Sequence, residues 1–223
     1  MDAKYLAFAS ITKKITMGIA GLFLIVFLVV HLTINLFLMS PDGGKTFNML
    51  SHFMGTNLFI KLFEVVLFAA IFIHIILGVI LQFQNWRSRP VRYLVTNKTK
   101  TPFLSKYMIY TGIVIFIFLV IHFINFYFRK LGWVDNTTIL ESGEPDFYRI
   151  AIDLFSNPLY SFVYIVLIIL VGFHLNHAFQ SAFQTLGLDH SKYTPFIKVA
   201  ASIYSIIIAV GFCLIPLYFL FIY

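Results

Sequence analysis

Four histidines lie deep inside four successive apolar stretches of this 223-residue chain: His31, His74, His122 and His174. An ionisable side chain in the hydrocarbon layer of a membrane is costly and usually serves a function. Imidazole is a common axial ligand of haem iron. Because one haem can take two imidazoles, four histidines, one in each stretch, predict two bis-histidine b-type haems within the bilayer, with these residues binding the two irons.

The stretches that carry the histidines are long enough to cross a membrane. The chain is 60% hydrophobic and 11% charged, whereas soluble domains carry about 25% charged residues. A spanning helix needs about 20 apolar residues, and the first run is far longer than the apolar core of a signal peptide. The sequence predicts an all-α membrane protein in which residues 1–223 form one bundle, with spans at about 14–39, 58–83, 105–128, 158–184 and 196–221.

The distribution of basic residues predicts how the bundle is oriented. Eleven of the sixteen Lys and Arg residues lie in the N-terminal segment and in the second and fourth loops. The other five share the opposite side with most of the acidic residues. Since cytoplasmic loops are enriched in Lys and Arg, we expect the N-terminus in the cytoplasm and the C-terminus outside. The net charge of +7 follows from this topology, and no basic stretch on a soluble domain suggests nucleic-acid binding.

The depths of the histidines predict how they pair. His31 and His122 each lie 17 residues past the inner end of an ascending span, and His74 and His174 each lie 10 residues before the inner end of a descending one. We therefore expect His31 with His122 at an outer haem and His74 with His174 at an inner haem. The two levels differ by about seven residues, or roughly 10 Å. His177, one turn from His174, is an alternative inner ligand.

Two glycines precede histidines at the same spacing. Gly21 comes ten residues before His31, and Gly112 comes ten residues before His122. Both would lie near the inner haem level, where a missing side chain leaves room for the macrocycle. The other interpretation is that they let helices pack closely. The repeated spacing also suggests that the first two spans resemble the third and fourth in layout.

Several absences in the sequence limit the function. The chain has one cysteine, Cys213, and iron–sulfur clusters need about four thiolates. It also lacks a glycine-rich dinucleotide motif, so we expect neither a flavin nor an iron–sulfur cluster on this chain. A partner must then supply or accept electrons. A haem-free transporter is another hypothesis, but the spans contain almost no acidic residues. His52 and His190 lie in predicted loops and are expected to be solvated.

Four segments together resemble a known family. They are HLTIN from His31, the stretch from Glu64 through His74 to Gly78, the stretch from Thr111-Gly112 to His122, and FHLNH from Phe173, which continues to Gly187. In this order they resemble the cytochrome b subunit of succinate:quinone oxidoreductases, of the single-chain, five-helix, dihaem type found in menaquinone-using bacteria. In that family the fourth ligand follows the Phe, which favours His174 over His177.

The resemblance implies a function, a location and partners. The chain would be a multi-pass protein of the bacterial cytoplasmic membrane and would anchor a flavoprotein subunit and an iron–sulfur subunit on the cytoplasmic face. Electrons would pass between succinate or fumarate and menaquinone by way of two haems b. The anchor of another haem-bearing oxidoreductase, such as a hydrogenase or formate dehydrogenase, is the alternative. The loop from Arg87 to Lys106 is expected to help dock the soluble partner.

The resemblance also points to further site residues. The family often places its quinone site near the outer haem, where Glu64 is a candidate acid or base. The alternative is that Glu64 complements a helix dipole. Some family members carry a glutamate two residues before the fourth ligand for proton transfer, whereas this chain has Gly172. Candidates for binding the inner-haem propionates are Lys13, Lys14, Lys106, Gln180, Ser181 and Gln184.

Overall fold

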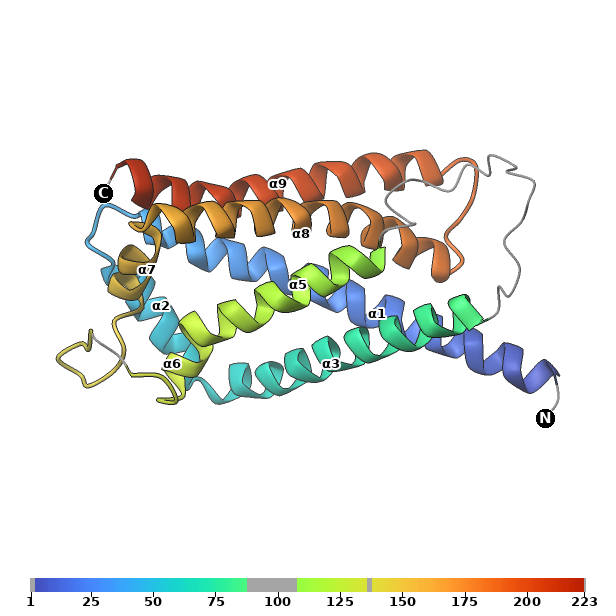
Figure 1. The fold of residues 1–223 in the computed structure, drawn as a ribbon, viewed down its shortest axis with the longest axis horizontal. Coiled ribbons are helices and arrows are strands. Elements are labelled where there is room, and N and C mark those ends of the chain that lie inside the picture. Colours follow the sequence, from blue (N-terminus) through green and yellow to red (C-terminus); the bar gives the residue numbers. More distant parts are fainter. Residues whose placement is uncertain (1–2, 88–107, 136–137, 223) are drawn as a thin grey trace.

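The chain folds into a bundle of long helices (Figure 1). The structure is a computed structural model, and it describes residues 3–87, 108–135 and 138–222, with side chains from residue 11 onward. Within these residues the β contacts amount to one isolated bridge, between Ile139 and Pro145. The predicted all-α class is therefore confirmed. The loop from Arg87 to Lys106, including Lys106, lies almost wholly outside the described residues.

Five helical segments of the described chain are long and apolar enough to cross a membrane, as predicted. They are α1 (Ala3–Leu36) with its 3-10 extension η1 (Phe37–Met39), α3 (Leu58–Arg87), α5 (Met108–His122) continued by η2 (Phe123–Tyr127) and α6 (Phe128–Lys130), α8 (Pro158–Thr185) and α9 (Thr194–Phe221). Two shorter helices are α2 (Lys45–Thr56) and α7 (Phe147–Phe155). The helix α2 was not predicted from the sequence.

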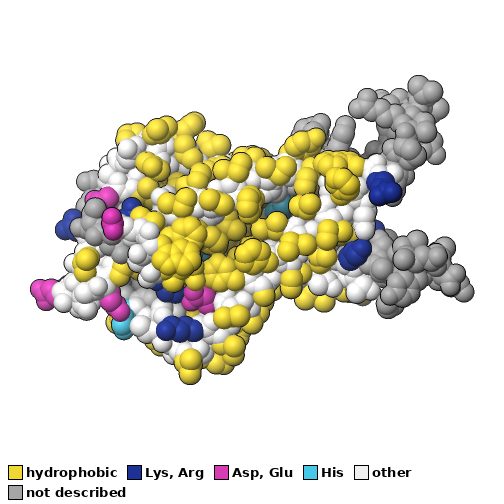
Figure 2. Space-filling model, turned by 60° about the horizontal axis from the view of Figure 1, so that its bottom comes forward, with side chains coloured by type: hydrophobic (Ala, Val, Ile, Leu, Met, Phe, Trp, Pro, Cys, Tyr) yellow, Lys and Arg dark blue, Asp and Glu magenta, His cyan; other side chains and the backbone are white. Residues whose placement is uncertain are grey.

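The two ends of the bundle differ. The helices α2 and α7 and the C-terminus lie at one end, which we call the cap end, and the N-terminus lies at the other, which we call the N-terminal end (Figure 1). Hydrophobic side chains cover the middle of the visible face, while the charged side chains gather toward its ends (Figure 2). An apolar belt between charged ends is the surface expected of a protein that crosses a bilayer.

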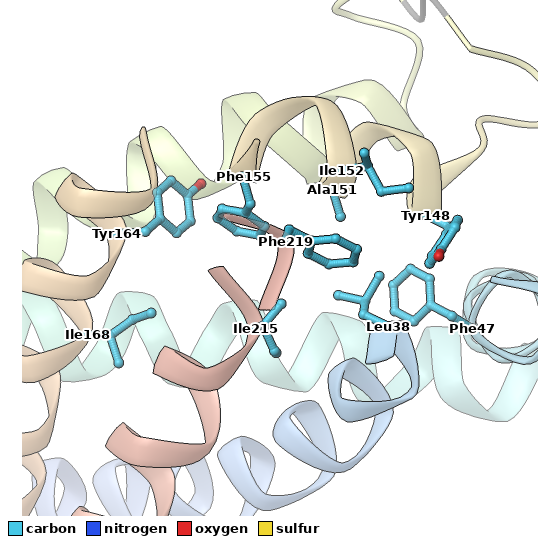
Figure 3. Close-up of a cluster of buried hydrophobic side chains, with 10 residues drawn as sticks. All are labelled: Leu38, Phe47, Tyr148, Ala151, Ile152, Phe155, Tyr164, Ile168, Ile215 and Phe219. Carbon is cyan, nitrogen blue, oxygen red and sulfur yellow. The ribbon is translucent and has the colours of Figure 1, made fainter. Parts of the chain in front are cut away.

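The best-packed part of the molecule is at the cap end. The amphipathic helix α7 buries five side chains there, and four of them belong to a cluster with residues of α8, α9, η1 and α2 (Figure 3). A second buried cluster, formed by Ile25, Leu32, Leu175 and Ile208, joins α1, α8 and α9. By contrast, the described part of α5 has no buried residue, and α3 has Ala70 and Leu81. Protein packing therefore concentrates on the α8–α9 side, while the α3–α5 side has few buried side chains.

A local sequence signal accounts for the start of α8 but not for the start of α9. Asn157 accepts hydrogen bonds from the backbone N–H groups of Leu159 and Tyr160 ahead of α8, as an N-cap does. Thr194 does not cap α9 in this way. Its hydroxyl instead donates to Asp189 and accepts from the backbone N–H of His190, because the preceding loop folds back onto it.

Candidate functional site

The first histidine pair joins α1 and α5 in the half of the bundle nearer the cap end. The ring centroids of His31 and His122 are 5.8 Å apart, and the rings are perpendicular. Phe27 stacks on His31 at 5.2 Å, and Phe126 lies 5.2 Å from His122. The helices thus bring together the two residues that were predicted to share the outer haem, within an aromatic frame.

The second pair joins α3 and α8 nearer the N-terminal end. The ring centroids of His74 and His174 are 6.4 Å apart. His74 faces the ring of His174, and the sequence alternative His177 lies one turn further along α8. The structure therefore brings together the predicted inner pair, while the role of each histidine as an iron ligand stays a prediction.

Both separations suit two imidazoles on opposite sides of one metal ion. With metal–nitrogen bonds of about 2 Å, two such rings have centroids roughly 6 Å apart. The observed values, 5.8 Å and 6.4 Å, bracket this separation. The described residues contain no group of three or more His, Cys, Asp or Glu side chains that could hold a metal ion. The donor set is therefore two separate imidazole pairs, which fits haem better than a bare metal ion.

Hydrogen bonds orient the rings of the inner pair. The hydroxyl of Thr111 donates to the carbonyl of Met108 at 3.0 Å, so its oxygen is an acceptor for Nδ1 of His174 at 3.1 Å. Nδ1 of His74 lies 3.4 Å from the carbonyl oxygen of Met17, which can only accept. In both rings the proton is thereby held on Nδ1, and Nε2 keeps the lone pair that an iron ligand needs.

The two pairs are further apart than the sequence suggested. Gly21 of α1 lies against His74, and His31 follows ten residues later. Thr111 of α5 contacts His174, and His122 follows eleven residues later. At 1.5 Å per residue the levels are separated by about 15 Å along these helices. The predicted separation of roughly 10 Å is wrong because it assumed that all apolar runs begin at one depth.

The structure gives the two predicted glycines different surroundings. A Cβ atom on Gly21 would lie 3.3 Å from Cε1 of His74, so the missing side chain admits the imidazole ring itself. A Cβ atom on Gly112 would meet nothing within 4 Å, so no helix packs closely there. At Gly172, a Cβ atom would lie 2.9 Å from Cβ of Ala209. The close approach of α8 and α9 leaves no room at that position for a glutamate.

Glu64 is not an isolated acid. One carboxylate oxygen accepts a hydrogen bond from the hydroxyl of Tyr127 at 2.6 Å, and the other pairs with the ammonium of Lys130 at 2.9 Å. Glu64 precedes His74 by ten residues, the same spacing that separates Gly21 from His31. Its carboxylate therefore lies near the level of the His31–His122 pair. Sequence reasoning found Glu64 but missed both of its partners.

Two polar cavities lie near the ends of the bundle. One, of about 240 Å³ at the cap end, is lined by residues that include Asn125, Arg129, Asp153, Asn157 and Tyr160. The other, of about 310 Å³ at the N-terminal end, includes three of the residues that were expected to bind haem propionates: Lys14, Ser181 and Gln184.

Other polar residues form contacts that the sequence did not indicate. Gln180, a further propionate candidate, instead donates to Asn176 at 2.6 Å. His52 is exposed, as expected, but it lies in α2 rather than in an irregular loop, and its Nδ1 is 2.7 Å from a carboxylate oxygen of Glu144.

Comparison with known proteins adds no assignment. No family model, no curated protein and no solved structure matches this chain. The functional argument therefore rests on the histidine pairs, on Glu64 and its partners, and on the arrangement of the five long helices.

Proposed function

We propose that this chain is the dihaem cytochrome b membrane anchor of a succinate:quinone oxidoreductase. The observation that carries the proposal is the presence of two imidazole pairs, with centroids 5.8 Å and 6.4 Å apart, at two levels of one membrane bundle. A structural role for one intramembrane histidine is common, but it does not explain four that meet in two pairs.

The residues around each pair fit a bound haem b. His31 and His122 would hold the haem nearer the cap end, and His74 and His174 would hold the other. Bound haem supplies reversible one-electron chemistry at each level. The scarcity of buried side chains on α3 and α5 supports this fit, because a macrocycle between these helices would cover surfaces that the protein itself leaves thinly packed.

The charges of the two ends support the proposed orientation. Lys13, Lys14, Arg87, Lys192 and Lys198 belong to the N-terminal end, and the acidic loop that contains Glu141 and Glu144 belongs to the cap end. By the positive-inside rule the N-terminal end faces the cytoplasm. The flavoprotein and iron–sulfur subunits of the proposed complex would dock there, and the pair formed by His74 and His174 would lie closer to them.

Quinone chemistry is proposed for the opposite level. Glu64 lies near the level of His31 and His122, and a carboxylate there can exchange protons with a quinone that is reduced or oxidised beside it. Menaquinone is the expected substrate by the family resemblance. The electron path from the N-terminal end to a quinone at the cap end would then cross most of the membrane.

The proposal is tested on the complex purified from its own membranes. Two b-type components should appear on reduction with succinate, and flavin- and iron–sulfur-bearing subunits should co-purify with the chain. The His122→Leu variant should lose one component and most quinone reduction while its other haem remains reducible by succinate. Absence of haem would overturn the proposal in favour of a haem-free transporter. Co-purification with a hydrogenase or formate dehydrogenase would assign the anchor to that enzyme instead.

A further inference from the structure

The π-helical turn η2 begins directly after His122 and changes which side chains face the same way. Five residues of regular α-helix would turn Tyr127 about 140° away from the direction of His122. A π turn closes from residue i to i+5, so Tyr127 stays nearly on the face of His122. Single π turns inside α-helices occur often at functional sites. This turn connects the His31–His122 pair to Glu64.

Tyr127 and Lys130 hold both oxygens of the Glu64 carboxylate. The 2.6 Å bond from Tyr127 and the 2.9 Å pair with Lys130 leave the carboxylate with a fixed orientation. The ammonium of Lys130 also lies 5.5 Å from the centre of the Tyr127 ring, and Phe68, one turn along α3 from Glu64, packs against that ring at 5.0 Å. Glu64 is 20% exposed and Lys130 is 31% exposed, so the pair is sheltered but not fully buried.

We propose that Lys130 and Tyr127 are positioning residues that, with Glu64, form one proton-transfer unit for the quinone. The inference rests on the proposed function. Quinone reduction takes up two electrons and two protons, and succinate oxidation supplies the electrons. In one protonation, the resting Glu64 carboxylate first takes up a proton from solvent, and the O–H bond of the resulting carboxylic acid then breaks as an O–H bond forms on a quinone oxygen. The resulting carboxylate is stabilised by the ammonium of Lys130 and the hydroxyl of Tyr127, and it regains a proton from the cap-end water.

The groups around Glu64 define which variants are informative. The titratable groups near it are Lys61 on α3, Tyr127 on η2 and Lys130 on α6, while α2 contributes Gly55, whose added Cβ would lie 3.5 Å from Cε of Lys130. Lys61 is exposed and precedes Glu64 by one turn. Lys61→Met therefore removes the same charge from the same region without breaking the ion pair, and it serves as the control.

The test measures succinate-driven reduction of dimethylnaphthoquinone by the assembled complex as a function of pH. Glu64→Gln should lower kcat about a hundredfold, the scale of a lost general acid. Lys130→Met should lower kcat about tenfold and change its pH profile, with a smaller effect on KM. Lys130→Arg should restore kcat to within about threefold of wild type, because it keeps the charge. Tyr127→Phe should also lower kcat and change its pH profile, as Lys130→Met does. Lys61→Met should have the kcat and pH profile of the wild type.

A second readout does not need turnover. Infrared difference spectra, assigned with Glu64→Gln, should show Glu64 ionised at neutral pH in the wild-type complex and protonated in Lys130→Met. If Glu64→Gln is strongly impaired while Lys130→Met and Tyr127→Phe resemble wild type in both readouts, this inference is wrong and the proposed function stands. If Glu64→Gln is fully active in a complex that carries both haems, the quinone reacts elsewhere, for example at the cavity lined by Asn125 and Asp153, and the inference is also overturned. Absence of haem instead overturns the proposed function itself.

Discussion

The contact between Gly21 and His74 allows the inner site to be tested without touching a proposed ligand. In Gly21→Ala the new methyl group would lie 3.3 Å from Cε1 and 3.5 Å from Nδ1 of His74. Carbon atoms prefer separations of about 3.5–4.0 Å, so the ring must withdraw by a few tenths of an ångström. Metal–ligand distances tolerate changes of about 0.2 Å. The displacement therefore reaches the limit of what an iron–imidazole bond accommodates.

The expected effect grows with the size of the side chain. Gly21→Ala should weaken binding of one haem roughly tenfold, the lower end of the effects produced by groups that orient a metal ligand. Gly21→Val should remove that haem, because valine in a helix has essentially one χ1 rotamer and cannot turn its methyl groups away. The other haem should remain, since His31 lies ten residues further along α1.

The assay is a reduced-minus-oxidised spectrum combined with transfer of haem to apomyoglobin, which reports loss of each component. Gly78→Ala is the matched control, because it lies on α3 one turn from His74 and a Cβ there would meet nothing within 4 Å. It should keep both haems. If Gly21→Val retains two haems with unchanged spectra, His74 does not bind iron from a position next to Gly21. The assignment of the inner pair is then refuted.

Three further predictions concern other parts of the chain. His177→Asn should keep both haems and His174→Asn should lose one, and the reverse pattern in the spectra would make His177 the ligand. Asn48→Ala should lower the free energy of unfolding by about 1–2 kcal/mol, because it removes the hydrogen bonds of the Asn48 amide with the carboxylate of Asp146 and with the backbone N–H of Tyr148, and an unchanged unfolding midpoint would contradict this. Hydrogen bonds from Thr46 lower the pKa of Asp42 from its ordinary value, so the stability it contributes is present above about pH 4 and is lost as pH falls through the lowered pKa. Asp42→Asn should therefore flatten the acid limb of a stability–pH curve, and an unchanged limb would exclude that contribution.

The sequence was informative where one helix period or one local motif decides the outcome. The five apolar runs depend only on neighbouring residues, and the structure has five helical segments long and apolar enough to cross a membrane. The depths of the histidines predicted which rings meet, because antiparallel spans share one membrane thickness, while their roles as haem ligands stay a prediction. The partners of Glu64 were missed because Tyr127 is 63 residues away and its direction depends on a π turn that no local pattern announces.

The same reasoning explains why α2 and its contacts were not foreseen. The hydrogen bond between Asn48 and Asp146 joins residues 98 positions apart, across two loops that look merely polar in the sequence. The ring of Tyr148 occupies the place where a Cβ on Gly44 would lie, so α7 packs directly against the turn before α2. The sequence alone does not reveal this contact, because the two residues are far apart in the chain. These contacts become visible once the long helices have brought the loops to one end.

The uneven packing of the bundle leads to a prediction about haem removal. Buried clusters join α1, α8, α9 and the cap helices, while the described parts of α3 and α5 bury few side chains. A group that binds the folded state stabilises it by mass action, and the elements that contact it gain most. In haem-depleted protein in detergent, amides of α3 and α5 should exchange at least about tenfold faster, while those of α9, which carries no proposed ligand, change little. If all five helices loosen equally, or if none does, the haems do not stabilise mainly the helices that carry their proposed ligands, and the proposed haem sites are refuted.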